Sequence, residues 1–147
     1  MTVIRNSVLL QCRPDEAFDY LSDHRAELEW NPKCKVMEKL TEGPVGLGTK
    51  YRAKWKGSPY VELEMVAFER PHTWTMHNGG AIEVTFTATV EGVTEGTRLS
   101  VEFVPRPHGL FRLVYPLFLL AIRRDERRNM DHIRDALERH ARSSPKR

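Results

Sequence analysis

The sequence predicts an α+β fold with an antiparallel β-sheet, two short helices after the first strand, and one long C-terminal α-helix. Between Lys33 and Pro105 the chain is a series of short segments rich in β-branched and aromatic residues, bounded by glycine, proline or asparagine. In the last two segments apolar and polar residues alternate cleanly, which is typical of strands with one buried face. From about Gly109 the period of the apolar residues changes to that of a helix.

The N-terminal part predicts a strand followed by two short helices. Residues 2–12 are rich in β-branched side chains and alternate imperfectly, which favours a strand. In the segment RPDEAFDYLSD, Pro14 suits a first helical turn and the acidic residues after it favour a helix N-terminus. The second helix, HRAELEW, is expected to end near Asn31, because a residue before proline avoids the helical region.

The strands predicted after these helices cover residues 33–41, 50–56, 60–69, 72–77, 81–91 and 97–105. In the fifth of them one face carries Ile82, Val84, Phe86, Ala88 and Val90, and the opposite face carries Glu83, Thr85, Thr87 and Thr89. This pattern indicates an antiparallel sheet with one solvated side.

The predicted C-terminal helix has two dissimilar halves. In the second half, Ile122, Met130, Ile133 and Leu137 fall within an arc of about 80° at 100° per residue. In the first half, residues 110–122 are apolar almost all round, and Pro116 is expected to kink or interrupt the helix. The run is shorter than the ~20 residues of a transmembrane helix. Three roles stay open for its excess apolar surface: wall and cover of an internal cavity, a homodimer contact, or a peripheral membrane contact.

Length and composition indicate one globular domain. The 147 residues are 40% hydrophobic and 29% charged, and we expect a domain at residues 1–141 followed by a disordered tail at 142–147. The net charge is only +3 and no nucleic-acid-binding motif is present, so nucleic acid is not an expected partner. The early break in the N-terminal apolar run argues against a signal peptide and predicts a cytoplasmic protein, in which Cys12 and Cys34 are small core residues.

Five motifs occur in the order found in a known superfamily. They are RPDEAFDYLSDHRAELEWNP at 13–32, GPVGLGTKYRAKW at 43–55, FERPHTW at 68–74, EGTRLSVEF at 95–103 and RRDERRNMDHIRDALE at 123–138. They are similar, in turn, to its proline-initiated helix, its Gly-x-Gly-Thr strand start, its strand-breaking proline, its Gly-Thr hairpin and its closing helix. The chain therefore resembles the START/Bet v 1-like (SRPBCC) superfamily, and within it the polyketide cyclase/dehydrase and lipid-transport group.

The resemblance implies a helix-grip fold, in which a curved antiparallel sheet wraps around the long C-terminal helix and leaves a cavity between them. It leaves three functions open, because one fold hosts many functions. The first is binding of a hydrophobic or amphipathic small molecule, lipid-like or polyketide-like. The second is a cyclase or dehydratase acting on an aromatic or enolisable substrate, with Tyr51, Tyr115 or Arg112 stabilising an enolate. The third is an accessory module that contacts another protein. No cofactor is expected for any of them.

The expected cavity lining is mostly aromatic, and ordinary core packing explains Phe86 and Phe103 equally well. Tryptophan and tyrosine bring an N–H or O–H group that needs a partner when it is buried. Arg112 either extends to solvent or binds a ligand carboxylate or enolate at the cavity mouth. The predicted ligand-binding residues are Trp30, Tyr51, Trp55, Met65, Trp74, Met76, Phe86, Phe103, Arg112, Tyr115, Phe118 and Ile122.

Known catalytic motifs do not occur in the sequence. It has no Ser-His-Asp signature, no GxSxG motif and no phosphate-binding loop. The histidines lack the spacing of metal ligands, so no metal site is expected. His77 or His108 would act as a general acid or base only if its ring turned inward. The sequence therefore assigns no catalytic residue.

Overall fold

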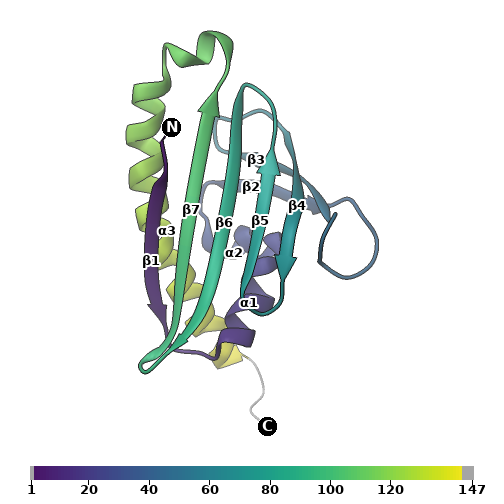
Figure 1. Ribbon diagram of the computed structural model, residues 1–147, viewed down its shortest axis with the longest axis vertical. Coiled ribbons are helices and arrows are strands. Elements are labelled where there is room, and N and C mark those ends of the chain that lie inside the picture. Colours follow the sequence, from purple (N-terminus) through teal and green to yellow (C-terminus); the bar gives the residue numbers. More distant parts are fainter. Residues whose placement is uncertain (1, 144–147) are drawn as a thin grey trace.

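The computed structural model describes residues 2–143 and shows strands and helices in the predicted order (Figure 1). They are β1 (Ile4–Leu10), α1 (Pro14–Ser22), the 3₁₀ helix η1 (His24–Ala26), α2 (Glu27–Trp30), β2 (Cys34–Lys39), β3 (Lys50–Trp55), β4 (Val61–Glu69), β5 (Thr73–Asn78), β6 (Ile82–Val93), β7 (Gly96–Pro107), the 3₁₀ helix η2 (Gly109–Arg112) and α3 (Tyr115–Ser143). The rest of the predicted tail at 142–147 lies outside the described residues.

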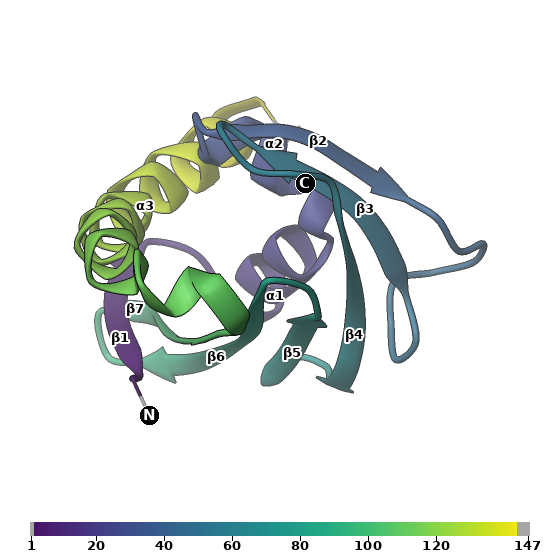
Figure 2. The same ribbon diagram turned by 90° about the horizontal axis from the view of Figure 1, so that it is seen from above.

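The strands form one seven-stranded sheet in the order β1-β7-β6-β5-β4-β3-β2, and every neighbouring pair is antiparallel. Seen from above, the sheet curls around the interior, with α3 along its open side next to β1 and α2 beside β2 (Figure 2). This arrangement confirms the predicted α+β helix-grip fold. It brings residues of the C-terminal helix opposite the inner face of the sheet.

The core lies on the inner face of the sheet, as the alternation predicted. Phe18 of α1 is fully buried and its ring meets the rings of Phe68 and Trp74 edge to face, with centroids 5.3 and 5.1 Å apart. From α3, the buried apolar side chains are Met130, Ile133, Ala136 and Leu137. The same narrow stripe that the sequence showed in the second half of the helix therefore packs against the sheet.

The start of α3 differs from the sequence-based expectation. The expected helix began near Gly109 and was interrupted at Pro116, whereas the chain forms the short η2, turns, and enters α3 at Tyr115. Pro116 thus lies in the first turn of α3, where its missing N–H has no intrahelical partner to lose. The proline permits the helix start instead of kinking a longer helix.

The apolar run 110–122 separates into two faces. The side chains of Tyr115, Phe118, Leu119 and Ile122 are half-buried. Those of Leu110, Leu113, Leu117 and Leu120 are exposed by 69–82%. Only the first set turns toward the interior, whereas the second set faces solvent. Among the described residues, no helix is long and apolar enough to cross a membrane.

The edge-to-face cluster at Phe18 yields a first prediction. Phe18→Ala should lower the free energy of unfolding by about 3–5 kcal/mol, because it leaves a cavity among packed rings. Urea denaturation followed by circular dichroism measures this change. Phe111→Ala is the matched control, since Phe111 is 46% exposed and should change stability by less than about 1 kcal/mol. Equal losses in the two variants would contradict the assignment of Phe18 to the core.

Candidate ligand-binding site

A buried histidine lies at the centre of the interior. His24 begins η1, directly after Asp23, whose side chain accepts a hydrogen bond from the Arg25 backbone N–H and so caps this turn. The His24 side chain is buried, and its Nε2 accepts a hydrogen bond of 2.9 Å from the indole Nε1 of Trp74. An indole N–H can only donate, so Nε2 carries no proton and the neutral ring is protonated at Nδ1.

The protonated side of this ring points to a buried carboxylate. Nδ1 of His24 lies 3.7 Å from Oε1 of Glu27, the first residue of α2. The other oxygen, Oε2, accepts hydrogen bonds from Trp55 Nε1 at 2.6 Å and from Asn31 Nδ2 at 2.8 Å. A buried carboxylate is costly unless it is hydrogen-bonded, and here two donors compensate Oε2 while Oε1 is left facing the histidine.

Tyr51 supports the same region from β3. Its hydroxyl accepts the backbone N–H of His24 at 3.3 Å and donates to Asp23 Oδ1 at 3.4 Å. Burial and the nearby charge of Asp23 raise the pKa of Tyr51 to about 12. Burial would also raise the pKa of Asp23, but hydrogen bonds from Arg25 outweigh it and bring that pKa below its ordinary value. Tyr51 therefore holds the turn that carries His24.

A second carboxyl reaches the interior from α3. Glu126 is partly buried, and its Oε2 accepts a hydrogen bond of 3.1 Å from Asn129 Nδ2. Burial, and next the negative charge of Glu27, raise the pKa of Glu126 from 4.5 to about 7. Near neutral pH this group therefore populates both its protonated and ionised forms, and it can donate or accept a hydrogen bond. We call His24, Glu27, Trp55, Trp74 and Glu126 the polar cluster.

Apolar side chains surround the polar cluster. Met65, Met76, Phe86 and Phe103 occupy paired positions on successive strands, so they form one row across β4, β5, β6 and β7. The two methionines are buried, whereas both phenylalanines are half-buried. At the start of α3, the half-buried rings of Tyr115 and Phe118 stack with centroids 6.3 Å apart. The interior thus combines an aromatic wall with a hydrogen-bonded polar end.

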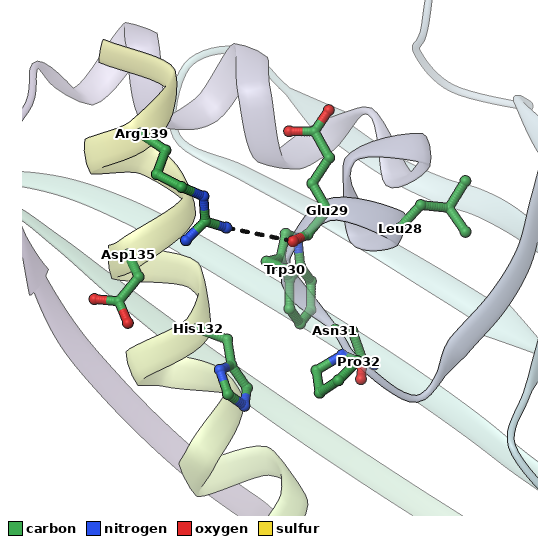
Figure 3. A pocket seen from close by; sticks show the side chains of 8 residues that line it. All are labelled: Leu28, Glu29, Trp30, Asn31, Pro32, His132, Asp135 and Arg139. Atoms are coloured by element: carbon green, nitrogen blue, oxygen red, sulfur yellow. Dashed lines mark hydrogen bonds between the residues drawn. The ribbon is translucent and has the colours of Figure 1, made fainter. Parts of the chain in front are cut away.

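A pocket opens on the outside beside the polar cluster, between α2 and α3 (Figure 3). Its volume is about 200 Å³, and it is lined by Leu28, Glu29, Trp30, Asn31, Pro32, His132, Asp135 and Arg139. Arg139 spans it, with Nη2 3.5 Å from the backbone oxygen of Glu29. Because Asn31 both lines this pocket and donates to Glu27, the pocket reaches the outer side of the polar cluster.

The structure brings most of the sequence-predicted residues to the interior. Tyr51, Trp55 and Trp74 take part in the hydrogen bonds of this polar end, and Trp30 lines the outer pocket. The three residues expected to stabilise an enolate are not brought together. The hydroxyl of Tyr51 is bonded to Asp23, that of Tyr115 donates to the Pro105 carbonyl at 3.2 Å, and Arg112 is exposed in η2.

Sequence reasoning missed the acidic and histidine members of the cluster, although two signals were present. His24, Glu27 and Asn31 have the spacing of one helix face, and Arg25 and Glu29 fall on the other side. Glu126 lies four residues after Ile122 and four before Met130, so a charged residue interrupts the predicted apolar stripe. A charge in such a stripe must face a partner or a polar interior.

The two histidines considered as acid–base candidates lie elsewhere. His77 alternates with the buried Trp74, Met76 and Asn78, so its ring is on the outer face of β5. Its Nε2 and that of His108 are 2.8 and 3.1 Å from the two carboxylate oxygens of Glu83. Hydrogen bonds from His77 and then His108 lower the pKa of Glu83. Within residues 2–143, no group of three or more acidic, histidine or cysteine side chains could hold a metal ion.

Fold and site together define an α+β helix-grip protein with an aromatic interior and a polar end. The family described as "Polyketide cyclase / dehydrase and lipid transport" matches residues 1–138, and the chain belongs to this family within the SRPBCC superfamily. No curated protein sequence matches the chain significantly.

Solved structures share this fold at low sequence identity. The protein TTHA0849 from Thermus thermophilus is 13% identical, with 97% of this chain and 100% of that chain covered and a TM-score of 0.78. The Zhui aromatase/cyclase from Streptomyces sp. R1128 is 13% identical, with 97% and 96% covered and a TM-score of 0.73. Ara h 8.0201 is 15% identical, with 97% and 99% covered and a TM-score of 0.63. At these identities the likeness establishes the fold alone.

The position of Glu126 predicts a pH dependence of stability. Its pKa of about 7 lies above the ordinary value of 4.5, so the folded state binds this proton more tightly than the unfolded state does. The resulting stabilisation is complete below about pH 4.5 and is lost as the pH rises through about 7. Glu126→Gln cannot ionise and so avoids the loss of stability at high pH. The variant should have a free energy of unfolding about 1–2 kcal/mol higher than that of the wild type at about pH 8, and nearly the same value at about pH 4.5.

Urea denaturation at several pH values measures this difference. Glu138→Gln is the matched control, because Glu138 is exposed on the same helix and its replacement should leave the pH profile parallel to that of the wild type. A Glu126→Gln profile that also runs parallel to the wild type would show that Glu126 does not face Glu27 in a dry interior.

Proposed function

We propose that this protein binds a small amphipathic molecule between its sheet and α3. The observation that carries the proposal is the polar cluster inside an apolar interior. A core built only for stability gains little from a buried carboxylate, since apolar residues of the same volume are often as stabilising. In a ligand-binding site a buried carboxylate is useful, because a few polar groups in an aromatic pocket fix the orientation of the bound ligand.

The chemistry of the cluster selects the class of ligand. Glu27 and Glu126 present two acidic groups, and His24 Nε2 and Glu27 Oε2 are already occupied by indole donors. A ligand carboxylate would meet like charge there, whereas a hydroxyl or amine would donate to the open carboxyl oxygens. The ligand is therefore a neutral or cationic aromatic or alicyclic molecule with a donor group, rather than a free fatty acid. Burying ~300 Å² of apolar ligand surface contributes roughly 7 kcal/mol before ordering costs.

Ligand binding is tested with native mass spectrometry of the gently purified protein and with the neutral fluorophore N-phenylnaphthylamine. Ile122→Lys should weaken fluorophore binding at least about tenfold, because it places a charge on the inward face of α3. Leu120→Lys is the matched control, since Leu120 lies two residues away on the exposed face. The proposal fails if neither method detects a bound molecule, or if the two lysine variants bind the fluorophore equally.

A second function is favoured by one observation, the position of Glu126. A carboxyl with a pKa of about 7 that faces an aromatic interior suits acid–base catalysis at neutral pH. As carboxylate it can take the α-proton of a ketone, leaving an enolate, and as acid it can return that proton. The family description, "Polyketide cyclase / dehydrase and lipid transport", favours an enolisable polyketide-like substrate.

This second function predicts proton exchange on an aromatic ketone. The protein should catalyse deuterium incorporation at the α-carbon of α-tetralone in D₂O, followed by NMR. Glu126→Gln should reduce the exchange rate at least about a hundredfold, because removal of a general base has that typical cost. The same variant should retain binding of N-phenylnaphthylamine. Binding without exchange in the wild type would leave the protein a binding protein and exclude this activity for the tested ketone.

A further inference from the structure

The exposed side of η2 and of the start of α3 carries a feature that ligand binding in the interior does not use. Leu110, Leu113, Leu117 and Leu120 are 82%, 80%, 72% and 69% exposed, and we call them the leucine face. They lie where η2 leads into α3, at the end of the molecule opposite the β6–β7 hairpin (Figure 1). So many exposed leucines within eleven residues are unusual, and large exposed apolar patches mark a contact with a partner or a membrane.

Arginines border the leucine face. Arg112 lies within it, and Arg123, Arg124, Arg127 and Arg128 follow along α3, all of them exposed. We call these arginines the basic band. At 100° per residue, Leu117, Leu120, Arg124, Arg127 and Arg128 fall within an arc of about 100°, so within α3 the exposed leucines continue directly into these three arginines. In the part of the chain that the structure describes, none of these arginines forms a side-chain ion pair.

Acidic groups do not offset this charge. Between Arg106 and Arg128 the only acidic residues are Asp125 and Glu126. Asp125 pairs with Lys33 Nζ at 2.7 Å, and Glu126 belongs to the polar cluster in the interior. The solvent side of this segment is therefore apolar at its start and positively charged along its length.

The charge decides between the possible occupants. A second copy packed on the leucine face would bring two sets of unpaired arginines together, which is unfavourable, because the next acidic residues of α3, Asp131 and Asp135, already pair with Arg134. A bilayer with anionic lipids offers hydrocarbon for the leucines and phosphate or carboxylate groups for the arginines. The helical rise from Leu120 to Arg127 is ~10 Å, comparable to the depth of a headgroup region.

We propose that the leucine face and the basic band dock this protein peripherally on a bilayer that contains anionic lipids. The leucines enter the boundary between headgroups and acyl chains, and the arginines contact the headgroups. The opposite side of α3 stays packed on the sheet, so docking needs no unfolding of the core. The inference is independent of the interior ligand.

Co-sedimentation with vesicles tests the docking. The wild type should bind vesicles of phosphatidylcholine with phosphatidylserine, bind poorly to phosphatidylcholine alone, and dissociate at high salt. Leu117→Glu should weaken binding at least about tenfold, because it places a carboxylate in the apolar boundary. Arg124→Gln and Arg127→Gln should each weaken it about fivefold. Circular dichroism of each variant checks that the fold is intact.

Matched controls change the same residue types elsewhere. Leu47→Glu alters a leucine that is 74% exposed in the loop between β2 and β3. Arg98→Gln alters an exposed arginine of β7 near the β6–β7 hairpin. Both should bind vesicles as the wild type does. Failure of the wild type to bind anionic vesicles overturns the proposal, as does equal loss in Leu47→Glu and Leu117→Glu. A wild-type dimer that Leu117→Glu dissociates, measured by sedimentation velocity, also overturns it and assigns the leucine face to a second copy.

Discussion

The interior is organised around the buried carboxylate of Glu27. Its two hydrogen bonds at Oε2 tie α2 to β3 through Trp55 and to the following loop through Asn31. Its other oxygen faces His24, which in turn binds Trp74 of β5. One charged group thereby connects the short helices to two strands of the curled sheet. Removing any single partner would leave a buried polar group unsatisfied, which costs more than the net value of the bond it made.

The carboxyl group of Glu126 adds a group that can gain or lose a proton near neutral pH. Glu126 reaches the interior from α3 and shares it with Glu27, so the two groups do not ionise independently. A proton held near neutral pH, beside an aromatic wall, serves equally well to orient a donor-bearing ligand and to transfer a proton. The two proposed functions, binding and catalysis, therefore rest on one geometry of this chain, and membership of the family alone does not choose between them.

The helix α3 serves two surfaces at once. Its inward side chains Ile122, Glu126 and Met130 complete the interior, while Leu117, Leu120 and the arginines that follow face solvent. Because 3.6 residues make one turn, neighbouring residues of one helical segment point to opposite sides. The segment can therefore carry apolar side chains toward the sheet and a different set of side chains toward solvent. Pro116 determines where the helix begins, because it favours a helix start at Tyr115. The preceding Leu110 and Leu113 therefore lie in η2 and in the turn.

The sequence by itself determined the fold class, the order of the elements and the inward phase of Trp74, Met76 and Phe86, because alternation and helical period are local properties. Five ordered motifs also indicated the family that matches residues 1–138. Only the tertiary structure decided that His24, Glu27 and Glu126 meet, and that Arg112, Tyr51 and Tyr115 do not share one site. Glu126 lies far along the chain from His24 and Glu27, as Arg112 and Tyr115 do from Tyr51, and the curl of the sheet around α3, which no local pattern encodes, sets the distances between them.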